Sequence, residues 1–216
     1  MSDRDAERGT VLVPGGRDVR ATLDRADESE RGDGATTSAE AGADACVVAC
    51  PPHPQQRGHR GDERLRAVSD ALGSRGVDCL RFDYGDWDEG YGERADARNA
   101  VGWAGERYDR VGLFGFSFGG CIALLAAAEV SVAAVSALAP TARLAEDLDA
   151  AAALDRVDCP VQVVYGSRDT TADWEPVVER ARDRGADVVE LSADHFFVGQ
   201  AGKVGETAGE WLAGRL

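Results

Sequence analysis

One serine lies between two glycines in a pattern that suits nucleophilic catalysis. Gly115, Ser117 and Gly119 form a G-x-S-x-G motif, preceded by the strand-like run 111–114 and followed by the helix-like run 121–125. A serine in a tight strand-to-helix turn projects its hydroxyl above a sheet, and residues two positions away must then lack side chains. The following helix directs its unpaired N–H groups toward the site, where negative charge develops during acyl transfer. The motif therefore predicts Ser117 as a nucleophile.

Two other interpretations of this turn are an incidental serine in a glycine-rich connection and a phosphate-binding loop. A Walker-type loop ends in Gly-Lys-Ser or Gly-Lys-Thr, and this segment contains no lysine. The strand-turn-helix setting favours the nucleophile over both.

The residues around the motif alternate between short apolar runs and longer helical stretches. The expected strands are 45–50, 77–82, 111–116, 132–138, 161–165 and 188–191. The expected helices are 63–74, 94–108, 118–129, 173–184 and 199–215. Continuously apolar strands between helices predict a mostly parallel, doubly wound α/β sheet. Functional residues of such sheets gather at the carboxyl ends of the strands, where Ser117 lies.

The N-terminal part follows a different pattern. Residues 10–14 and 18–24 flank Gly15-Gly16, which predicts a β-hairpin. Residues 25–44 are almost devoid of apolar side chains, which predicts a long mobile loop inside the domain. With 44% apolar residues, the chain can fill one core, and we expect a single domain over residues 1–216.

With this motif in this setting, the sequence from Ala45 onward resembles the α/β-hydrolase family. Within that family it is similar to small, lid-poor esterases related to dienelactone hydrolases. The resemblance implies an α/β-hydrolase fold and a triad in the order nucleophile, acid, histidine. It implies His195, after the last expected strand, as general base, and Asp169, after strand 161–165, as the acid. An imidazole suits the base because its pKa lies near neutrality.

Two other aspartates lie close to these positions. Asp173 is the second candidate for the acid, but we expect it to cap the helix that begins near Trp174. Asp194 is disfavoured because neighbouring side chains on an extended loop point apart, and it directly precedes His195.

The tetrahedral intermediate of acyl transfer needs N–H donors for its oxyanion. The N–H of Phe118, directly after the nucleophile, is expected to supply one. The resemblance implies that the second comes from loop 50–58, where Gln55 is the predicted donor. Here His53 is expected to shape the loop, and His59 is expected to be an exposed loop residue.

Two further segments border the expected site. Residues 83–90 form an acidic loop whose Tyr84 and Trp87 are candidates for lining a pocket. Between the strands 132–138 and 161–165, only a short helix such as 142–154 fits. We therefore expect an open site without a large lid.

The composition is strongly acidic. The 216 residues include 39 Asp and Glu against 24 basic residues, of which only Lys203 is lysine, and the formal net charge is −15. Such a charge disfavours nucleic acid and anionic membranes as partners. The lack of an apolar segment at the charged N-terminus predicts a cytoplasmic protein. The bias toward acidic residues and arginine resembles proteins of salt-loving archaea.

The cysteines and histidines indicate neither a metal site nor a disulfide framework. The five cysteines include no C-x-x-C pair, and four of them lie in or beside apolar runs. We expect buried free thiols, with Cys46 and Cys50 on one face of their strand. No metal and no cofactor is expected.

Taken together, the residues predict a serine hydrolase that cleaves a small ester or thioester through an acyl-enzyme. Two alternatives stay open at this point. One is a non-catalytic binding or regulatory protein with the same fold. The other is acyl transfer or peptide hydrolysis by the same triad. Neither the exact substrate nor the oligomeric state follows from the sequence.

Overall fold

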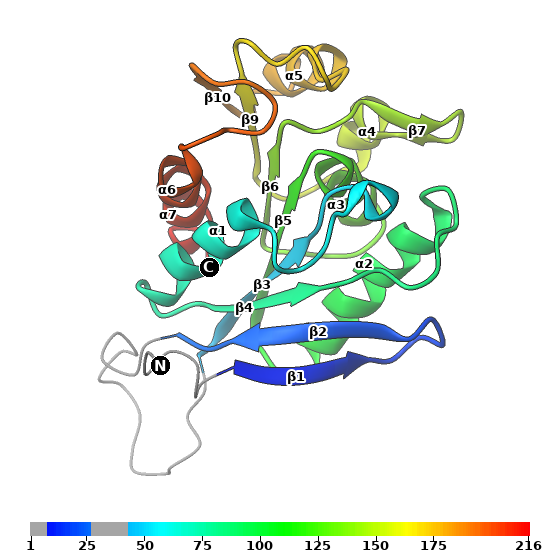
Figure 1. The fold of residues 1–216 in the computed structure, drawn as a ribbon, viewed down its shortest axis with the longest axis vertical. Helices are drawn as coiled ribbons and strands as arrows, with labels where there is room; N and C mark the ends of the chain where they lie inside the picture. The colour runs from blue at the N-terminus through cyan, green and yellow to red at the C-terminus, as the bar shows by residue number, and fades with distance from the viewer. Residues whose placement is uncertain (1–7, 27–42) are drawn as a thin grey trace.

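A computed structural model describes residues 8–26 and 43–216. Its centre is an eight-stranded sheet in the order β1-β2-β4-β3-β5-β6-β9-β10 (Figure 1). The strands are β1 (Arg8–Val13), β2 (Val19–Asp24), β3 (Ala45–Cys50), β4 (Asp78–Phe82), β5 (Arg110–Phe116), β6 (Ala134–Leu138), β9 (Val161–Gly166) and β10 (Asp187–Leu191). The six from β3 onward in this sheet pair in parallel, whereas β1 and β2 form an antiparallel hairpin at one edge. This confirms the predicted doubly wound sheet with an N-terminal hairpin.

Helices cover both faces of the sheet, which explains why the central strands are apolar throughout (Figure 1). One face packs against α2 (Tyr91–Gly105), α3 (Phe118–Ala127) and α5 (Glu175–Asp183). The other packs against α1 (Glu63–Gly73) and the C-terminal helical segment. Alternate residues of β3 belong to the two cores, so Cys46 and Cys50 share one face as predicted. Four cysteines are buried, and Cys159 is partly exposed.

The C-terminal helical segment differs from the single α-helix expected over 199–215. It runs through α6 (Ala201–Val204), a π-helical turn η5 (Gly205–Gly209) and α7 (Glu210–Ala213). Gly205 packs closely on α1, because a Cβ at this position would lie 2.5 Å from the carbonyl oxygen of Ala67.

The helix predicted over 142–154 is wrong in its first half. Residues there form a two-stranded hairpin of β7 (Arg143–Ala145) and β8 (Leu148–Asp149), followed by α4 (Ala150–Ala153) and the 3-10 turn η4 (Leu154–Arg156). The carboxylate of Asp149 accepts the N–H of Ala152 at 2.9 Å, which starts the helix at Ala150. The same carboxylate pairs with Arg143 across the hairpin. Among the residues that the structure describes, this short insertion is all that lies between β6 and β9, so no large lid covers the sheet there.

The segment predicted as a mobile loop, 25–44, lies mostly outside the described residues, which omit 27–42. Its first described part is tied to the sheet, since the N–H of Ala26 donates to the buried carboxylate of Asp78 at 2.8 Å.

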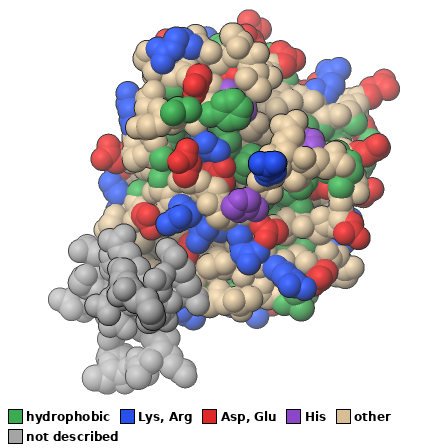
Figure 2. Space-filling view, viewed as in Figure 1, with side chains coloured by type: hydrophobic (Ala, Val, Ile, Leu, Met, Phe, Trp, Pro, Cys, Tyr) green, Lys and Arg blue, Asp and Glu red, His purple; other side chains and the backbone are tan. Residues whose placement is uncertain are grey.

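Charged side chains of both signs are interspersed over the face shown in Figure 2. Across residues 8–26 and 43–216, none of the helices combines the length and the apolar character that crossing a bilayer requires.

Candidate active site

Ser117 occupies the sharp turn between β5 and α3. Its backbone has φ 56° and ψ −118°, a conformation that costs energy for a residue with a side chain. The two flanking glycines permit the turn: a Cβ at Gly115 would lie 2.0 Å from the carbonyl oxygen of Gly119. A Cβ at Gly119 would lie 2.3 Å from the carbonyl oxygens of both Cys50 and Pro51. The glycines of the motif are therefore required by close backbone contacts.

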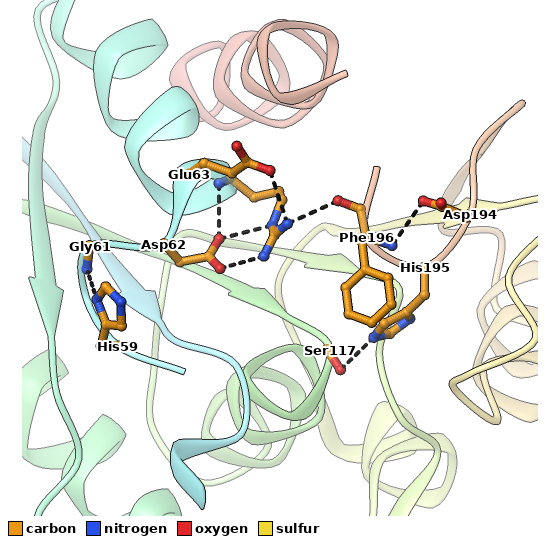
Figure 3. Close-up of polar contacts among 9 residues, drawn as sticks. His59, Gly61, Asp62, Glu63, Ser117, Asp194, His195 and Phe196 are labelled. Atoms are coloured by element: carbon orange, nitrogen blue, oxygen red, sulfur yellow. Dashed lines mark hydrogen bonds and ion pairs between the residues drawn. The ribbon is translucent and has the colours of Figure 1, made fainter. Parts of the chain in front are cut away.

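His195 lies in the loop after β10 and reaches the Ser117 hydroxyl. Its Nε2 is 3.0 Å from Ser117 Oγ, and Figure 3 shows the two side chains pointing toward each other. On the opposite side of the ring, Nδ1 is 2.7 Å from Asp169 Oδ2. The Asp169 side chain is fully buried, and that of His195 is 6% exposed. The three residues form a continuous hydrogen-bonded chain.

Asp169 is held in the turn after β9 by main-chain donors. Its Oδ1 accepts the N–H groups of Thr171 at 2.8 Å and Ala172 at 3.1 Å. These bonds fix the direction of the carboxylate. An ionised Asp169 accepts a proton-bearing Nδ1, which leaves Nε2 of a neutral His195 able to accept the serine proton.

The other two aspartates near the site have structural roles. Asp173 was expected to cap α5, but the helix begins one residue later, after Trp174, which forms no side-chain cap. Asp173 instead accepts the N–H of Ala142 through its main-chain oxygen at 2.9 Å. Asp194 accepts the N–H of Phe196 at 3.1 Å and shapes its own loop. Of the three aspartates, Asp169 is the one whose carboxylate bonds to His195.

The expected second oxyanion donor, Gln55, is engaged elsewhere. Its N–H donates to His53 Nδ1 at 3.3 Å at the start of the 3-10 turn η3 (Pro54–Gln56). His53 thus shapes the loop as predicted, but it does so by occupying the donor that was expected to face Ser117. His59, as predicted, is exposed, and it accepts the N–H of Gly61 at 3.0 Å (Figure 3).

Another N–H of the same loop has no such partner. The N–H groups of Gln56 and Gly58 donate to the carbonyl oxygen of His53, whereas that of His53 itself meets no acceptor among the described residues. The carbonyl oxygens of Cys50 and Pro51 lie against Gly119 in the first turn of α3. This contact places the nearby His53 beside the turn that carries Ser117. The His53 ring lies 4.9 Å from the Phe118 ring, measured between their centres. The main-chain N–H of Phe118, at the first position of α3, has no acceptor within that helix.

An aromatic layer supports His53. Trp87 stacks on its ring at 4.7 Å, and the Tyr84 hydroxyl donates to the carbonyl oxygen of Pro51 at 3.1 Å. Burial lowers the pKa of His53, an effect that the charge of Glu93 opposes. Tyr84 and Trp87 were candidates for lining a pocket, but neither lines the cavity beside Ser117; both pack against the loop that carries His53.

Glu93 was not anticipated from the sequence. This fully buried carboxylate accepts the N–H groups of Asp88 at 2.9 Å and Gly90 at 2.8 Å. It thereby fixes loop 83–90, which carries Trp87, and starts α2 at Tyr91, three residues before the expected start.

A cavity of about 320 Å³ opens above Ser117 and His195. Its lining includes His53 and Gln56 and the apolar residues Leu144 and Phe196. Asp62 and Arg64, at the start of α1, also line it and were not anticipated as site residues. The Asp-x-Arg spacing at a helix start was visible in the sequence, but the contact of Arg64 with a loop 132 residues away was not.

Solved structures similar to this chain cover nearly all of it. An α/β serine hydrolase homologue from Coxiella burnetii is 23% identical with a TM-score of 0.78, and 98% of each chain is covered. A serine hydrolase without a lid from Xanthomonas campestris is 20% identical with a TM-score of 0.74, over 95% of each chain. A dienelactone hydrolase from Anabaena variabilis is 24% identical with a TM-score of 0.72, over 97% of this chain and 98% of that one. These similarities support the α/β-hydrolase fold.

No curated protein sequence matches the chain. A family model does: residues 87–195 match the dienelactone hydrolase family. The matched segment spans half of the chain and runs from Trp87 through the Ser117 turn to His195. On this match, the protein belongs to the dienelactone hydrolase family and is a hydrolase.

Proposed function

We propose that the enzyme hydrolyses a carboxylic ester or thioester through an acyl-enzyme on Ser117. Ser117 Oγ attacks the carbonyl carbon while its proton passes to His195 Nε2, and Asp169 stabilises the imidazolium. The bond to the leaving oxygen or sulfur breaks, and His195 returns the proton to it. Water then attacks the acyl-enzyme with His195 as base and releases the acid. The observation that carries this proposal is the chain of contacts at 3.0 Å and 2.7 Å.

The oxyanion of this reaction is assigned to two main-chain donors. Phe118 N–H, at the start of α3, supplies one. The second is the N–H of His53 in place of Gln55, because Gln55 donates to His53 Nδ1 while His53 N–H lacks an acceptor in the described part of the chain.

An ester-like small molecule is supported by the site and by the family. A lactone is a cyclic ester, and the cavity of about 320 Å³ suits a small substrate. Acyl transfer or peptide hydrolysis would use the same triad, and the identity of the acceptor decides between them.

The test compares hydrolysis of short p-nitrophenyl esters and thioesters by the wild type and by Ser117→Ala. We expect the substitution to lower kcat on the order of 10⁴-fold or more, because no other group replaces the nucleophile. Ser131→Ala, at an exposed serine, is the matched control and should keep full activity. Equal activity of the wild type and Ser117→Ala would refute the proposal and favour a non-catalytic role for this site.

A further inference from the structure

Arg64 touches both of the segments that carry the reacting groups. Its Nη1 donates to the carbonyl oxygen of Phe196 at 2.9 Å, directly after His195. Its guanidinium lies 4.4 Å from the ring centre of Phe116, directly before Ser117. The Phe116 ring in turn lies 5.3 Å from the His195 ring. One side chain from the start of α1 therefore contacts the neighbours of the nucleophile and of the base.

The guanidinium is itself fixed by Asp62, the N-cap of α1. Arg64 donates through Nε to Asp62 Oδ1 at 2.9 Å and through Nη2 to Oδ2, a two-pronged pairing. Both side chains are nearly buried, at 12% and 11% exposure. Because Asp62 already fixes the planar guanidinium of Arg64, little further conformational entropy is lost when it also binds the Phe196 carbonyl oxygen.

The loop that carries His195 is also held by the buried Phe197, which packs on Phe116, and by Arg168, which donates to Ser192. Asp194 accepts the N–H of Phe196 at 3.1 Å (Figure 3). The Phe196 side chain is 52% exposed. Phe196, the residue that follows His195, is thus fixed at its N–H from within the loop and at its carbonyl oxygen by Arg64. Among the described contacts, Arg64 supplies the donor to the Phe196 carbonyl oxygen, so its removal loosens the residue directly after His195.

We propose that Arg64, oriented by Asp62, is a positioning residue that keeps His195 within reach of the Ser117 hydroxyl. This inference rests on the proposed function of the triad. Arg64 also lines the cavity, but its guanidinium nitrogens already donate to Asp62, Glu63 and Phe196, so we expect its loss to slow the chemical step more than it weakens substrate binding. A shift of about 1 Å in a reacting group costs on the order of 10²-fold in rate.

The experiment measures kcat and KM on a p-nitrophenyl ester for Arg64→Met, which keeps an unbranched apolar stem but lacks the guanidinium, with its charge and its donors. We expect kcat to fall roughly 10- to 100-fold and KM to change less than about threefold. Arg64→Lys should recover part of the loss. Arg66→Met is the matched control, because Arg66 lies exposed on the same helix and forms no ion pair within the described residues; its kcat should equal that of the wild type.

A double-mutant cycle separates positioning from general destabilisation. The rate at which a fluorophosphonate modifies Ser117 is measured for Arg64→Met in the wild-type and in the His195→Ala background. If Arg64 acts through His195, its removal slows labelling only where His195 is present. The inference is overturned by an equal loss in both backgrounds, by an unchanged kcat, or by a change confined to KM.

Failure of the proposed function would look different, because Ser117→Ala would then retain wild-type activity. Thermal unfolding monitored by circular dichroism checks that each variant is folded. If Arg64→Met does not fold, the same comparison is made with Arg64→Lys, which retains the charge but lacks the planar fork; unchanged kcat in that variant overturns the inference.

Discussion

At the scale of single residues, the proposed reactivity of Ser117 depends on how its neighbours orient His195, the proton acceptor. The Asp169 carboxylate accepts two main-chain N–H groups on one oxygen and faces His195 Nδ1 with the other. This arrangement selects the tautomer in which Nε2 is unprotonated toward Ser117.

Asp169→Asn tests this role. An amide in the same place favours the wrong tautomer of His195, so we expect kcat to fall roughly 10⁴-fold with little loss of stability. Asp173→Asn is the control, because the described contact of Asp173 in this region is made by its main-chain oxygen. Steady-state kinetics on one ester decides the point, and a larger effect at Asp173 than at Asp169 would reverse the assignment of the acid.

His53→Pro tests the reassigned oxyanion donor. The φ of His53 is −54°, which proline accepts, so this substitution removes the N–H without forcing a new backbone conformation. His53→Ala removes the same imidazole but keeps the N–H. We expect kcat of His53→Pro to lie about 10²- to 10³-fold below that of His53→Ala, the usual effect of losing one oxyanion donor. Equal kcat values for the two variants would exclude this N–H from the oxyanion site.

At the scale of elements, the site depends on the close approach of the segment after β3 to the first turn of α3. The carbonyl oxygens of Cys50 and Pro51 leave no space for a side chain at Gly119. The same approach brings His53 beside the nucleophile turn.

Gly119→Ala is therefore expected to force these segments apart. We expect a loss of about 1–3 kcal/mol in the free energy of unfolding and a strong loss of activity. Gly102→Ala is a matched control within α2, where an added Cβ meets nothing within 4 Å. There the exchange should stabilise the protein by roughly 0.5–1 kcal/mol. Urea unfolding measures both, and similar stabilities of the two variants would contradict the packing described here.

The elements themselves were largely predictable, because apolar runs such as 45–50 and 161–165 report burial on both faces of a sheet. The errors have local causes. Asp149 caps a helix inside the predicted 142–154 segment, and Glu93 starts α2 early. Both helix starts depend on which main-chain N–H groups a carboxylate reaches. The hydrophobic periodicity of the sequence does not reveal this.

The site residues likewise fall into those that the sequence predicts and those that depend on contacts between distant segments. Ser117, His195 and Asp169 follow from a motif and a chain order, and the structure brings them together. We reassign the second oxyanion donor away from Gln55 because its N–H donates to His53 Nδ1 over 3.3 Å, a contact that the sequence does not reveal. Arg64 was missed because its partner Phe196 lies 132 residues away in the sequence.

At the scale of the whole molecule, the dominant feature is the net charge of −15. Repulsion among like charges destabilises a compact state, and salt screens it. The reach of such interactions falls from about 10 Å at 0.1 M salt to about 3 Å at 1 M.

We expect the unfolding midpoint to rise by at least about 3 °C when KCl increases from roughly 0.1 M to 1 M, equivalent to about 1 kcal/mol for a chain of this size. Differential scanning calorimetry measures the shift. A midpoint that stays constant or falls with KCl would contradict the expectation that repulsion among the like charges lowers the stability of this protein.

The central claim is that Ser117 is a nucleophile activated by His195 and Asp169. The most direct measurement is reaction of the folded protein with a fluorophosphonate, followed by peptide mass spectrometry to locate the adduct. We predict a single adduct on Ser117 that forms rapidly in the wild type and far more slowly in His195→Ala. An unmodified Ser117 in the folded wild-type protein, or labelling at equal rates in both proteins, would contradict the account.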